Sequence, residues 1–166
     1  NERALLHIDN AYYLSDVEVE NYLCKTNTST STAFRGFGGN QGMMVIENII
    51  DNISRHLKRD SCEIRKLNFY HKNKKNITHY GMKIEDNIIN EIFDKLVKKS
   101  NYKKRYSKIK KFNLKNKYKK KGIAITPVKF GISFTTIHLN QAGALVHIYT
   151  DGSIHLNHGG IEMGQG

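Results

Sequence analysis

The sequence predicts an α+β fold, with packed helices in its first half and a β-rich second half. Apolar side chains recur every three or four residues in two stretches, 41–57 and 84–97, which is the spacing of one face of an amphipathic helix. After residue 121 the chain changes to short β-rich runs, and Asp151-Gly152 separates two of them as in a β-hairpin. Helices and strands segregated along the chain are typical of the α+β class.

The first half is predicted to begin with a strand, a glycine-rich turn and a long helix. Residues 4–14 mix apolar and aromatic side chains and predict the strand, and the polar run 27–32 predicts a loop. The turn is residues 36–39, and the helix after it has an apolar face of Met43, Ile46, Ile50, Ile53 and Leu57. The turn therefore leads into a helix N-terminus, where backbone N–H groups lack partners within the helix.

Further helices are predicted between residues 60 and 112. Asp60 followed by Glu63 has the spacing of a capping box and predicts a short helix through Leu67. The helix at 84–97 has an apolar face of Ile84, Ile88, Ile92 and Leu96, with Ile89, Phe93 and Val97 beside it. A weaker stripe then follows at Tyr102, Tyr106, Ile109 and Phe112, which places the neighbouring lysines on the solvent face.

The second half is predicted to consist of short strands. Residues 122–128 and 131–137 are two such runs, and 142–150 pairs with 153–158 across the Asp-Gly turn. We therefore expect a first subdomain, a basic helical connector and a second subdomain, over residues 1–97, 98–121 and 122–166.

The net charge of +12 is concentrated in one segment. Residues 98–121 hold thirteen Lys or Arg and no acid, whereas the rest of the chain carries fourteen basic and fifteen acidic residues. A nucleic-acid-binding module is one alternative for this segment, built on Lys119, Lys120 and Lys121 with Tyr102, Tyr106 and Tyr118. The scarcity of Arg and the general enrichment in Lys, Asn and Ile favour a compositional bias instead.

Several other features bound the possible functions. The chain starts without Met and stops within a glycine-rich run, so we expect it to be a piece of a longer protein. No apolar stretch approaches the ~20 residues of a membrane helix, and a cytoplasmic location is expected. Cys24 and Cys62 are expected to be buried, reduced thiols. The histidines at 7, 138, 147, 155 and 158 have no metal-ligand spacing.

The two glycine-rich segments match neither a Walker loop nor a dinucleotide fingerprint. Residues 32–39, Thr-Ala-Phe-Arg-Gly-Phe-Gly-Gly, resemble the molybdopterin-binding signature of the xanthine dehydrogenase family. Similar stretches follow in the family's order at residues 129–135, 139–147, 149–153 and 158–166, and another precedes them at 2–14. The chain is most similar to the bacterial two-subunit type, in which this region lies in the large subunit.

The resemblance implies part of a molybdopterin-binding domain of the xanthine dehydrogenase/aldehyde oxidase type, with mixed sheets. It implies a molybdenum-molybdopterin cofactor here, and two 2Fe–2S clusters and FAD on another domain or subunit, with NAD as electron acceptor. The complete enzyme is expected to be a dimer that hydroxylates hypoxanthine and xanthine toward urate. An aldehyde oxidase is the alternative within the same class.

The resemblance also assigns roles to individual residues. Phe37 and Phe134 match the rings that sandwich the purine, Arg3 matches the residue that meets its oxygen, and Thr135 matches a residue beside the substrate. Arg35 matches the residue whose backbone faces the molybdenum centre. Further cofactor contacts are expected from Gly36, Gly38, Gly39, Met163, Gly164 and Gln165. The general-base glutamate is expected beyond Gly166, so the isolated segment is expected to be inactive.

Overall fold

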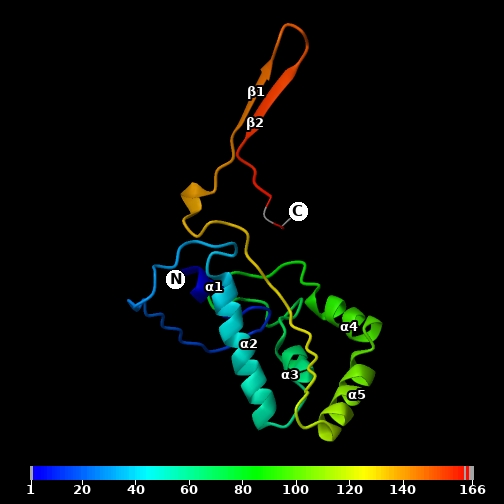
Figure 1. Cartoon of the computed structure of the whole chain (residues 1–166). Helices are drawn as coiled ribbons and strands as arrows, with labels where there is room; N and C mark the ends of the chain where they lie inside the picture. Colours follow the sequence, from blue (N-terminus) through cyan, green and yellow to red (C-terminus); the bar gives the residue numbers. More distant parts are fainter. Residues whose placement is uncertain (1, 163, 165–166) are drawn as a thin grey trace.

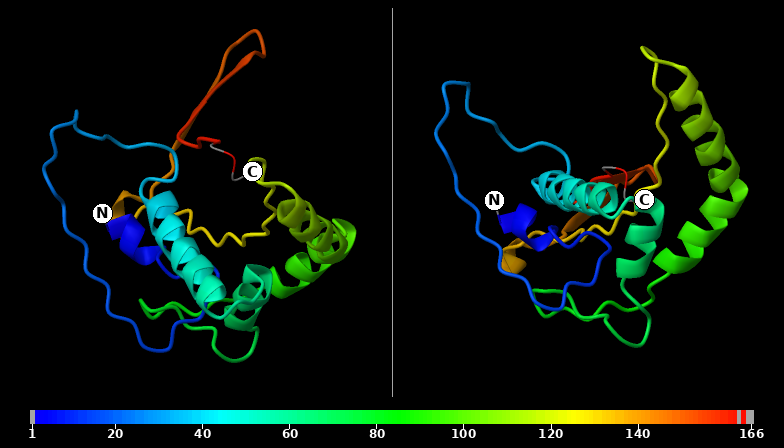
Figure 2. Two further views of the ribbon diagram at one scale, coloured as in Figure 1. Left: turned by 60° about the horizontal axis from the view of Figure 1, so that its bottom comes forward. Right: turned by 90° about the horizontal axis from the view of Figure 1, so that it is seen from below.

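The computed structural model describes residues 2–162 and 164 of the chain. Helices make up a body from which a two-stranded hairpin projects, as Figures 1 and 2 show. The elements of this described part are α1 Glu2–Leu6, α2 Gly39–His56, α3 Ser61–Asn68, α4 Ile89–Lys99, α5 Tyr102–Lys115, the 3-10 turn Ile137–Leu139, β1 Ala144–Ile148 and β2 Ile154–His158. The α+β class is confirmed, but the only sheet among the described residues is this hairpin, so the expected mixed sheets are not present in them.

The long helix α2 confirms the prediction made from its apolar periodicity. It begins directly after the glycine-rich turn, with Gly38 as its N-cap at a φ of 109°. Ile46 and Ile50 are buried as expected, but Ile53 and Leu57 are 41% and 51% exposed. Near its C-terminus the buried face of the helix passes instead through the small residue Ser54.

Local capping groups fix where α3 and α4 begin. Asp60 caps α3 as predicted, since its Oδ1 accepts a hydrogen bond from the Cys62 N–H at 3.0 Å. The predicted helix at 84–97 begins later, at Ile89, whose N–H donates to Asn87 Oδ1 at 3.1 Å. The preceding Ile84 belongs to the loop instead, because its N–H donates to the Asn76 carbonyl.

The basic segment contains helix α5, whose lysines lie on the solvent face as predicted. Tyr102 is buried at its start, and the Tyr102 hydroxyl donates to Asp60 Oδ1 at 2.9 Å. Lysine ammonium groups lie over the rings of Tyr106, Phe112 and Tyr118, at 4.7, 4.2 and 5.4 Å. These three rings are therefore partly covered by the chain's own cations.

The strand predicted for residues 4–14 is wrong. The chain forms α1 and then a series of turns, with Asn10 at a φ of 43°. Only Tyr12 pairs like a strand residue, in an isolated antiparallel bridge to Phe69. The run is apolar because Ala11 and Tyr12 belong to the core, and the core requires burial but not a β conformation.

The strands predicted for residues 122–128 and 131–137 are also wrong, since no strand is assigned between residues 116 and 143 of the described chain. The segment is extended and Ile125 enters the core. Its backbone hydrogen bonds go partly to side chains: the Asn10 amide donates to Pro127 O and accepts from Lys129 N–H. Side-chain hydrogen bonds thus take the place of a β-ladder.

The predicted hairpin is confirmed, with Val146 opposite Leu156 and Gly152 in the turn at a φ of 84°. The turn is reinforced by Asp151 Oδ1, which accepts from the Ser153 N–H and hydroxyl at 2.9 and 2.7 Å. Every residue of both strands is exposed.

A buried ionic network crosses the interface between α2 and α3. Arg65 is 3% exposed and bonds to Glu47 through Nε at 2.7 Å and to Asp51 through Nη2 at 3.2 Å. The Tyr12 hydroxyl donates to Glu47 Oε1 at 2.5 Å, and burial is the main cause of the raised pKa of Tyr12. The surrounding core is made of Ala11, Tyr12, Ile46, Ile50, Cys62, Ile64, Phe69, Phe93, Tyr102 and Ile125.

The two cysteines are free, but only Cys62 is buried, so the expectation that Cys24 is buried is wrong. Burial raises the pKa of Cys62 to about 11. Because the thiolate is the reactive form, we expect a thiol reagent at mildly alkaline pH to modify Cys24 much faster than Cys62. Time-resolved peptide mass spectrometry measures both rates, with the denatured chain as control. Equal rates in the folded chain would contradict the burial of Cys62.

Candidate functional site

The glycine-rich turn before α2 has an unusual backbone conformation. Gly36, Phe37 and Gly38 all have positive φ angles, of 92°, 51° and 109°. Glycine adopts such angles readily, but a phenylalanine held there costs on the order of 1–3 kcal/mol. Strain of this kind at a single residue is frequent where a side chain must be presented to a ligand.

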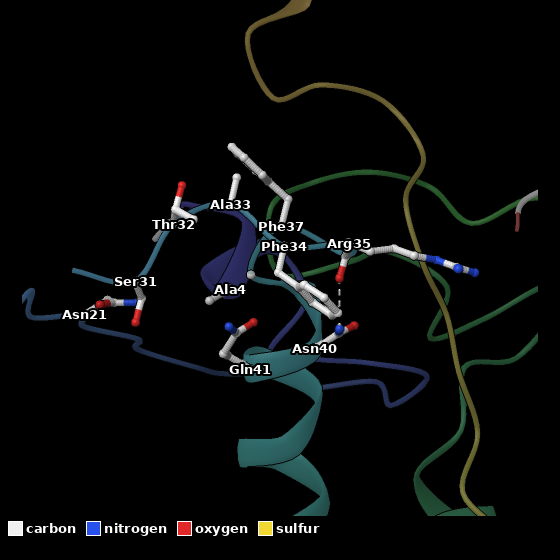
Figure 3. Close-up of a pocket in the computed structure, with 11 residues that line it drawn as sticks. Ala4, Asn21, Ser31, Thr32, Ala33, Phe34, Arg35, Phe37, Asn40 and Gln41 are labelled. Atoms are coloured by element: carbon white, nitrogen blue, oxygen red, sulfur yellow. Dashed lines mark hydrogen bonds between the residues drawn. The ribbon is translucent and has the colours of Figure 1, made fainter. Parts of the chain in front are cut away.

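A pocket of about 370 Å³ lies beside this turn. Figure 3 shows that polar side chains from the loop before this turn line the pocket, together with others from the start of α2. The amide of Asn40 donates to the Arg35 carbonyl at 3.1 Å, which holds the turn against the helix. The lining residues are Ala4, Asn21, Ser31, Thr32, Ala33, Phe34, Arg35, Phe37, Gly38, Asn40 and Gln41.

Phe37 and Phe134, which lie in distant parts of the sequence, are in contact. Their ring centroids lie 6.0 Å apart with an interplanar angle of 45°. Both rings are accessible, with Phe37 52% and Phe134 42% exposed. The chain therefore brings two accessible aromatic faces to the edge of the turn. Thr135, the next residue along the chain, is half-buried.

Arg3 on α1 reaches the same segment. Its guanidinium donates hydrogen bonds to the carbonyls of Gly131 and Ser133, the latter immediately before Phe134. The guanidinium carbon also lies 5.0 Å from the centre of the Phe130 ring. Arg3, Phe37 and Phe134 are thus assembled in one region, although three separate parts of the sequence supply them.

Side chains from the start of the chain also bind the segment around residues 127–131. We call the set of residues that makes these contacts the clip: Arg3, His7, Asp9, Asn10 and Lys129. His7 Nε2 accepts from the Gly131 N–H at 3.0 Å, and Asn10 bonds to the backbone at residues 127 and 129. The Lys129 ammonium lies 2.5 Å from Asp9 Oδ2. Residues more than a hundred positions apart are thus held in register by polar groups rather than by a sheet.

The carboxylate of Asp9 is fully buried at the centre of the clip. Besides Lys129, its Oδ2 accepts a hydrogen bond from the Tyr70 hydroxyl at 2.7 Å. Burial, followed by that hydrogen bond, raises the pKa of Tyr70, so Tyr70 remains a neutral donor to Asp9. The Lys129 ammonium also lies over the rings of Tyr70 and Tyr80, at 5.2 and 5.6 Å. A buried charge is tolerated when it is paired and hydrogen-bonded in this way.

Close packing explains two of the glycines near the site. A Cβ at Gly39 would lie 2.7 Å from the Phe130 ring, and one at Gly42 would collide with the Ala4 carbonyl. Both glycines therefore allow α1 and the segment around residue 130 to approach α2. For Gly39 this is a packing role, found at a position that we expected to contact a cofactor.

The two glycine-rich segments of the sequence meet at Arg35. A Cβ at Gly164 would collide with the Arg35 guanidinium, so the bare backbone of the second segment lies directly beside that cation. The carbonyl of Arg35 is occupied by Asn40, which donates a hydrogen bond to it. Arg35 therefore joins the turn before α2 to the C-terminal glycine-rich segment.

The last residues of the chain bear on two expectations from the sequence. Met163 and Gln165, which we expect to contact the cofactor, lie outside the described residues, and so does Gly166. The general-base glutamate is expected beyond Gly166, outside this sequence. Within the segment, the carboxylate of Glu162 accepts a hydrogen bond from the Gly164 N–H, which is a local turn contact. The cofactor contacts of Met163 and Gln165 and the base beyond Gly166 therefore stay predictions.

His7, Asp9 and Asn10 were not singled out for the site by their sequence pattern. The available signal was three polar residues inside an otherwise apolar run, which indicates buried polar groups with fixed partners. Within the described residues, no group of three or more His, Cys, Asp or Glu could hold a metal ion. None of the described helices is long and apolar enough to span a membrane.

Comparison with known proteins gives a family for this arrangement. Two family models match, each described as a molybdopterin cofactor-binding domain, over residues 1–69 and 95–166. The xanthine dehydrogenase/oxidase of Gallus gallus and the xanthine dehydrogenase of Dictyostelium discoideum are each 50% identical to 99% of this chain. The xanthine dehydrogenase of Drosophila pseudoobscura is 46% identical over the same share. The chain spans 12% of the length of these curated relatives.

These relatives come from eukaryotes, so the expected bacterial two-subunit origin has no support. The expected family and its molybdenum-molybdopterin cofactor are confirmed, because both models describe domains that bind molybdopterin. The chain belongs to the xanthine dehydrogenase family of oxidoreductases, and it corresponds to a region of their molybdopterin cofactor-binding domains.

Proposed function

We propose that this chain is part of a molybdenum-dependent xanthine dehydrogenase that hydroxylates hypoxanthine and xanthine toward urate. In that enzyme it supplies the residues that hold the flat purine and part of the cradle of the cofactor. The observation that carries the proposal is the contact between Phe37 and Phe134, two accessible rings brought together from distant parts of the chain.

The geometry of the two rings suits a planar substrate. A flat ring between two others needs about 7 Å between the outer rings, because stacked carbon atoms approach to about 3.5 Å. The observed centroid separation is 6.0 Å with a tilt of 45°. If the two phenylalanine rings move about 1 Å further apart and rotate into parallel planes, a purine fits between them. The strained φ of Phe37 supports this role, since it fixes the direction in which that ring is presented.

Arg3 provides the cation for such a substrate. Attack on the purine carbon moves negative charge onto a carbonyl oxygen of the purine, and a guanidinium beside that oxygen stabilises this charge more in the transition state than in the ground state. The guanidinium already lies next to the backbone of Ser133, one residue from Phe134. We propose that the purine oxygen competes with these carbonyls for the Arg3 donors, and that Thr135 lies beside the substrate.

The described residues fit an anionic, oxygen-rich cofactor. The Arg35 guanidinium lies against the bare backbone of Gly164, where any larger residue would fill the space. A cation beside backbone that carries no side chain is a suitable environment for phosphate or pterin oxygens. We propose that Arg35, Gly36, Gly38, Gly39 and Gly164 hold molybdopterin, with the Arg35 backbone toward the metal. When bound, the molybdenum cofactor supplies the hydroxylation and takes up the electrons that leave the substrate carbon.

The remaining features belong to the complete enzyme. We propose that it is a cytoplasmic dimer in which 2Fe–2S clusters and FAD, on another domain, pass the electrons to NAD. An aldehyde oxidase-type enzyme is the alternative, and the cation at position 3 favours the purine. A nucleic-acid-binding role has less support, because lysine ammonium groups of the chain itself lie over one face of the rings of Tyr106, Phe112 and Tyr118.

The proposal is tested by steady-state oxidation of xanthine in the full-length enzyme that contains this segment. We expect urate formation by the wild type, and a rise in KM of about 5- to 150-fold for Phe37→Ala or Phe134→Ala, since stacking of a base on an aromatic side chain is worth about 1–3 kcal/mol. Tyr22→Ala is the matched control, because this aromatic residue is 77% exposed on the loop that precedes the glycine-rich turn. A wild-type enzyme that leaves xanthine unchanged would refute the proposed function.

A further inference from the structure

His7 lies between Arg3 and the segment that carries Phe134, which are two parts of the proposed substrate site. Its Nδ1 is 2.9 Å from the carbonyl of Arg3, one turn earlier, and its Nε2 accepts from the Gly131 N–H at 3.0 Å. Because Nε2 is the acceptor, the proton of the neutral ring is on Nδ1, and this N–H donates to the Arg3 carbonyl. One imidazole thus bonds to the residue that carries the guanidinium and to the segment that carries Phe134.

The position of His7 is fixed from all sides. The residue is 5% exposed, and its ring packs against Phe130 with centroids 4.8 Å apart. A Cβ added to Gly39, at the start of α2, would lie 3.4 Å from the His7 ring, so the start of this helix also packs against the ring. The ring therefore cannot change orientation without moving Phe130 or α2.

We propose that His7 is a positioning residue, which sets the separation between the Arg3 guanidinium and the Phe134 segment and so determines how well a purine is held for turnover. This inference rests on the proposed function. His7 itself does not touch the substrate; it acts through the Gly131 N–H and the Arg3 carbonyl. Displacement of a positioned group by about 1 Å is enough to lower turnover about 100-fold.

The arrangement requires the neutral form of His7, since a protonated ring has no acceptor for the Gly131 N–H. Burial lowers the pKa of His7, and the positive charges of Arg3 and Lys129 act in the same direction. The bond to the Arg3 carbonyl and the charge of Asp9 oppose this effect. Helix α2 approaches the ring through Gly39, which carries no side chain. The contact with Gly131 is thus kept at neutral pH and is lost as the pH falls through the lowered pKa.

The experiment compares the wild-type full-length enzyme with two variants of His7 and one control variant. His7→Gln retains an acceptor near the position of Nε2 and has no titrating ring, whereas His7→Leu removes both hydrogen bonds. We expect kcat/KM for xanthine to fall about 10- to 100-fold in His7→Leu and less in His7→Gln. The ratio of kcat/KM in the wild type to kcat/KM in His7→Gln should decrease as the pH falls, because only the wild type loses its hydrogen-bond acceptor at low pH. His71→Leu, at an exposed histidine, is the control.

The outcomes separate the two proposals. Molybdenum content and thermal stability, measured on every variant, show whether folding and cofactor loading are retained. A wild type that does not oxidise xanthine refutes the proposed function, and the positioning role with it. An active wild type with an unchanged His7→Leu refutes the positioning role alone. A ratio of kcat/KM between the wild type and His7→Gln that stays constant with pH also refutes the positioning role. This second measurement decides the question if His7→Leu fails to fold.

Discussion

Arg3→Met in the full-length enzyme is expected to lower kcat for xanthine about 10²- to 10³-fold, which is the effect of removing one preorganised donor from a developing negative charge. The guanidinium lies beside Ser133 and over Phe130, within reach of a purine held against Phe134. The loss should appear mainly in kcat rather than in KM, since the charge develops only during attack. Phe37 and Phe134 remain to bind flat substrates.

A small aromatic aldehyde is the control substrate, because it has no second oxygen that needs the cation. Its oxidation should be largely retained in Arg3→Met. Equal losses on xanthine and on the aldehyde would show that Arg3 supports the fold, through its bonds to the Gly131 and Ser133 carbonyls, rather than the substrate. No loss on either substrate would show that Arg3 has no part in the site.

The largest effect on stability is expected for Arg65→Ala. The guanidinium is 3% exposed, and it neutralises Glu47, which is 18% exposed. Removing one partner of a buried pair leaves the other charge without compensation, which typically costs about 3–5 kcal/mol. Urea denaturation of the chain, followed by far-UV circular dichroism, measures the change in the free energy of unfolding.

Arg59→Ala is the matched control for this substitution. Arg59 pairs with Glu63 at 3.3 Å, but the two side chains are 49% and 59% exposed. An ion pair this exposed is worth about 0–1 kcal/mol, so the control should be close to wild type. Similar losses in both variants would show that the Arg65 network is as hydrated as the surface pair.

Local signals in the sequence predicted the elements that depend on neighbouring residues. Asp60 caps α3, and Asp151-Gly152 makes the hairpin turn, both through contacts between residues close in the chain. The apolar period located α2 but not its whole buried face, which ends on Ser54 because of tertiary packing. The strands expected at 4–14, 122–128 and 131–137 are wrong. Apolar residues of these segments belong to the core, but their backbone groups bond partly to distant side chains instead of to a neighbouring strand.

The candidate site was predictable in its parts but not in its assembly. The resemblance of three motifs singled out Arg3, Phe37 and Phe134, but their proximity depends on packing between α1, the glycine turn and the segment around residue 131. His7 and Lys129 also lie in matching stretches, but the resemblance gave them no role, and a single histidine or lysine in a sequence carries no information about a partner more than a hundred residues away.

The clip also determines the order in which the chain is assembled during synthesis. Lys129 follows its partner Asp9 by 120 residues, so at about 5–20 residues per second it leaves the ribosome about 6–24 s later. Until then the Asp9 carboxylate has no cation from this segment and must stay hydrated, which keeps the first turns of the nascent chain open. Residues 39–70 can form their own helices in that interval, because their capping and pairing contacts are local. Arg3, Phe37 and Phe134 are therefore brought together only when the segment around residue 131 closes over a helical body that already exists.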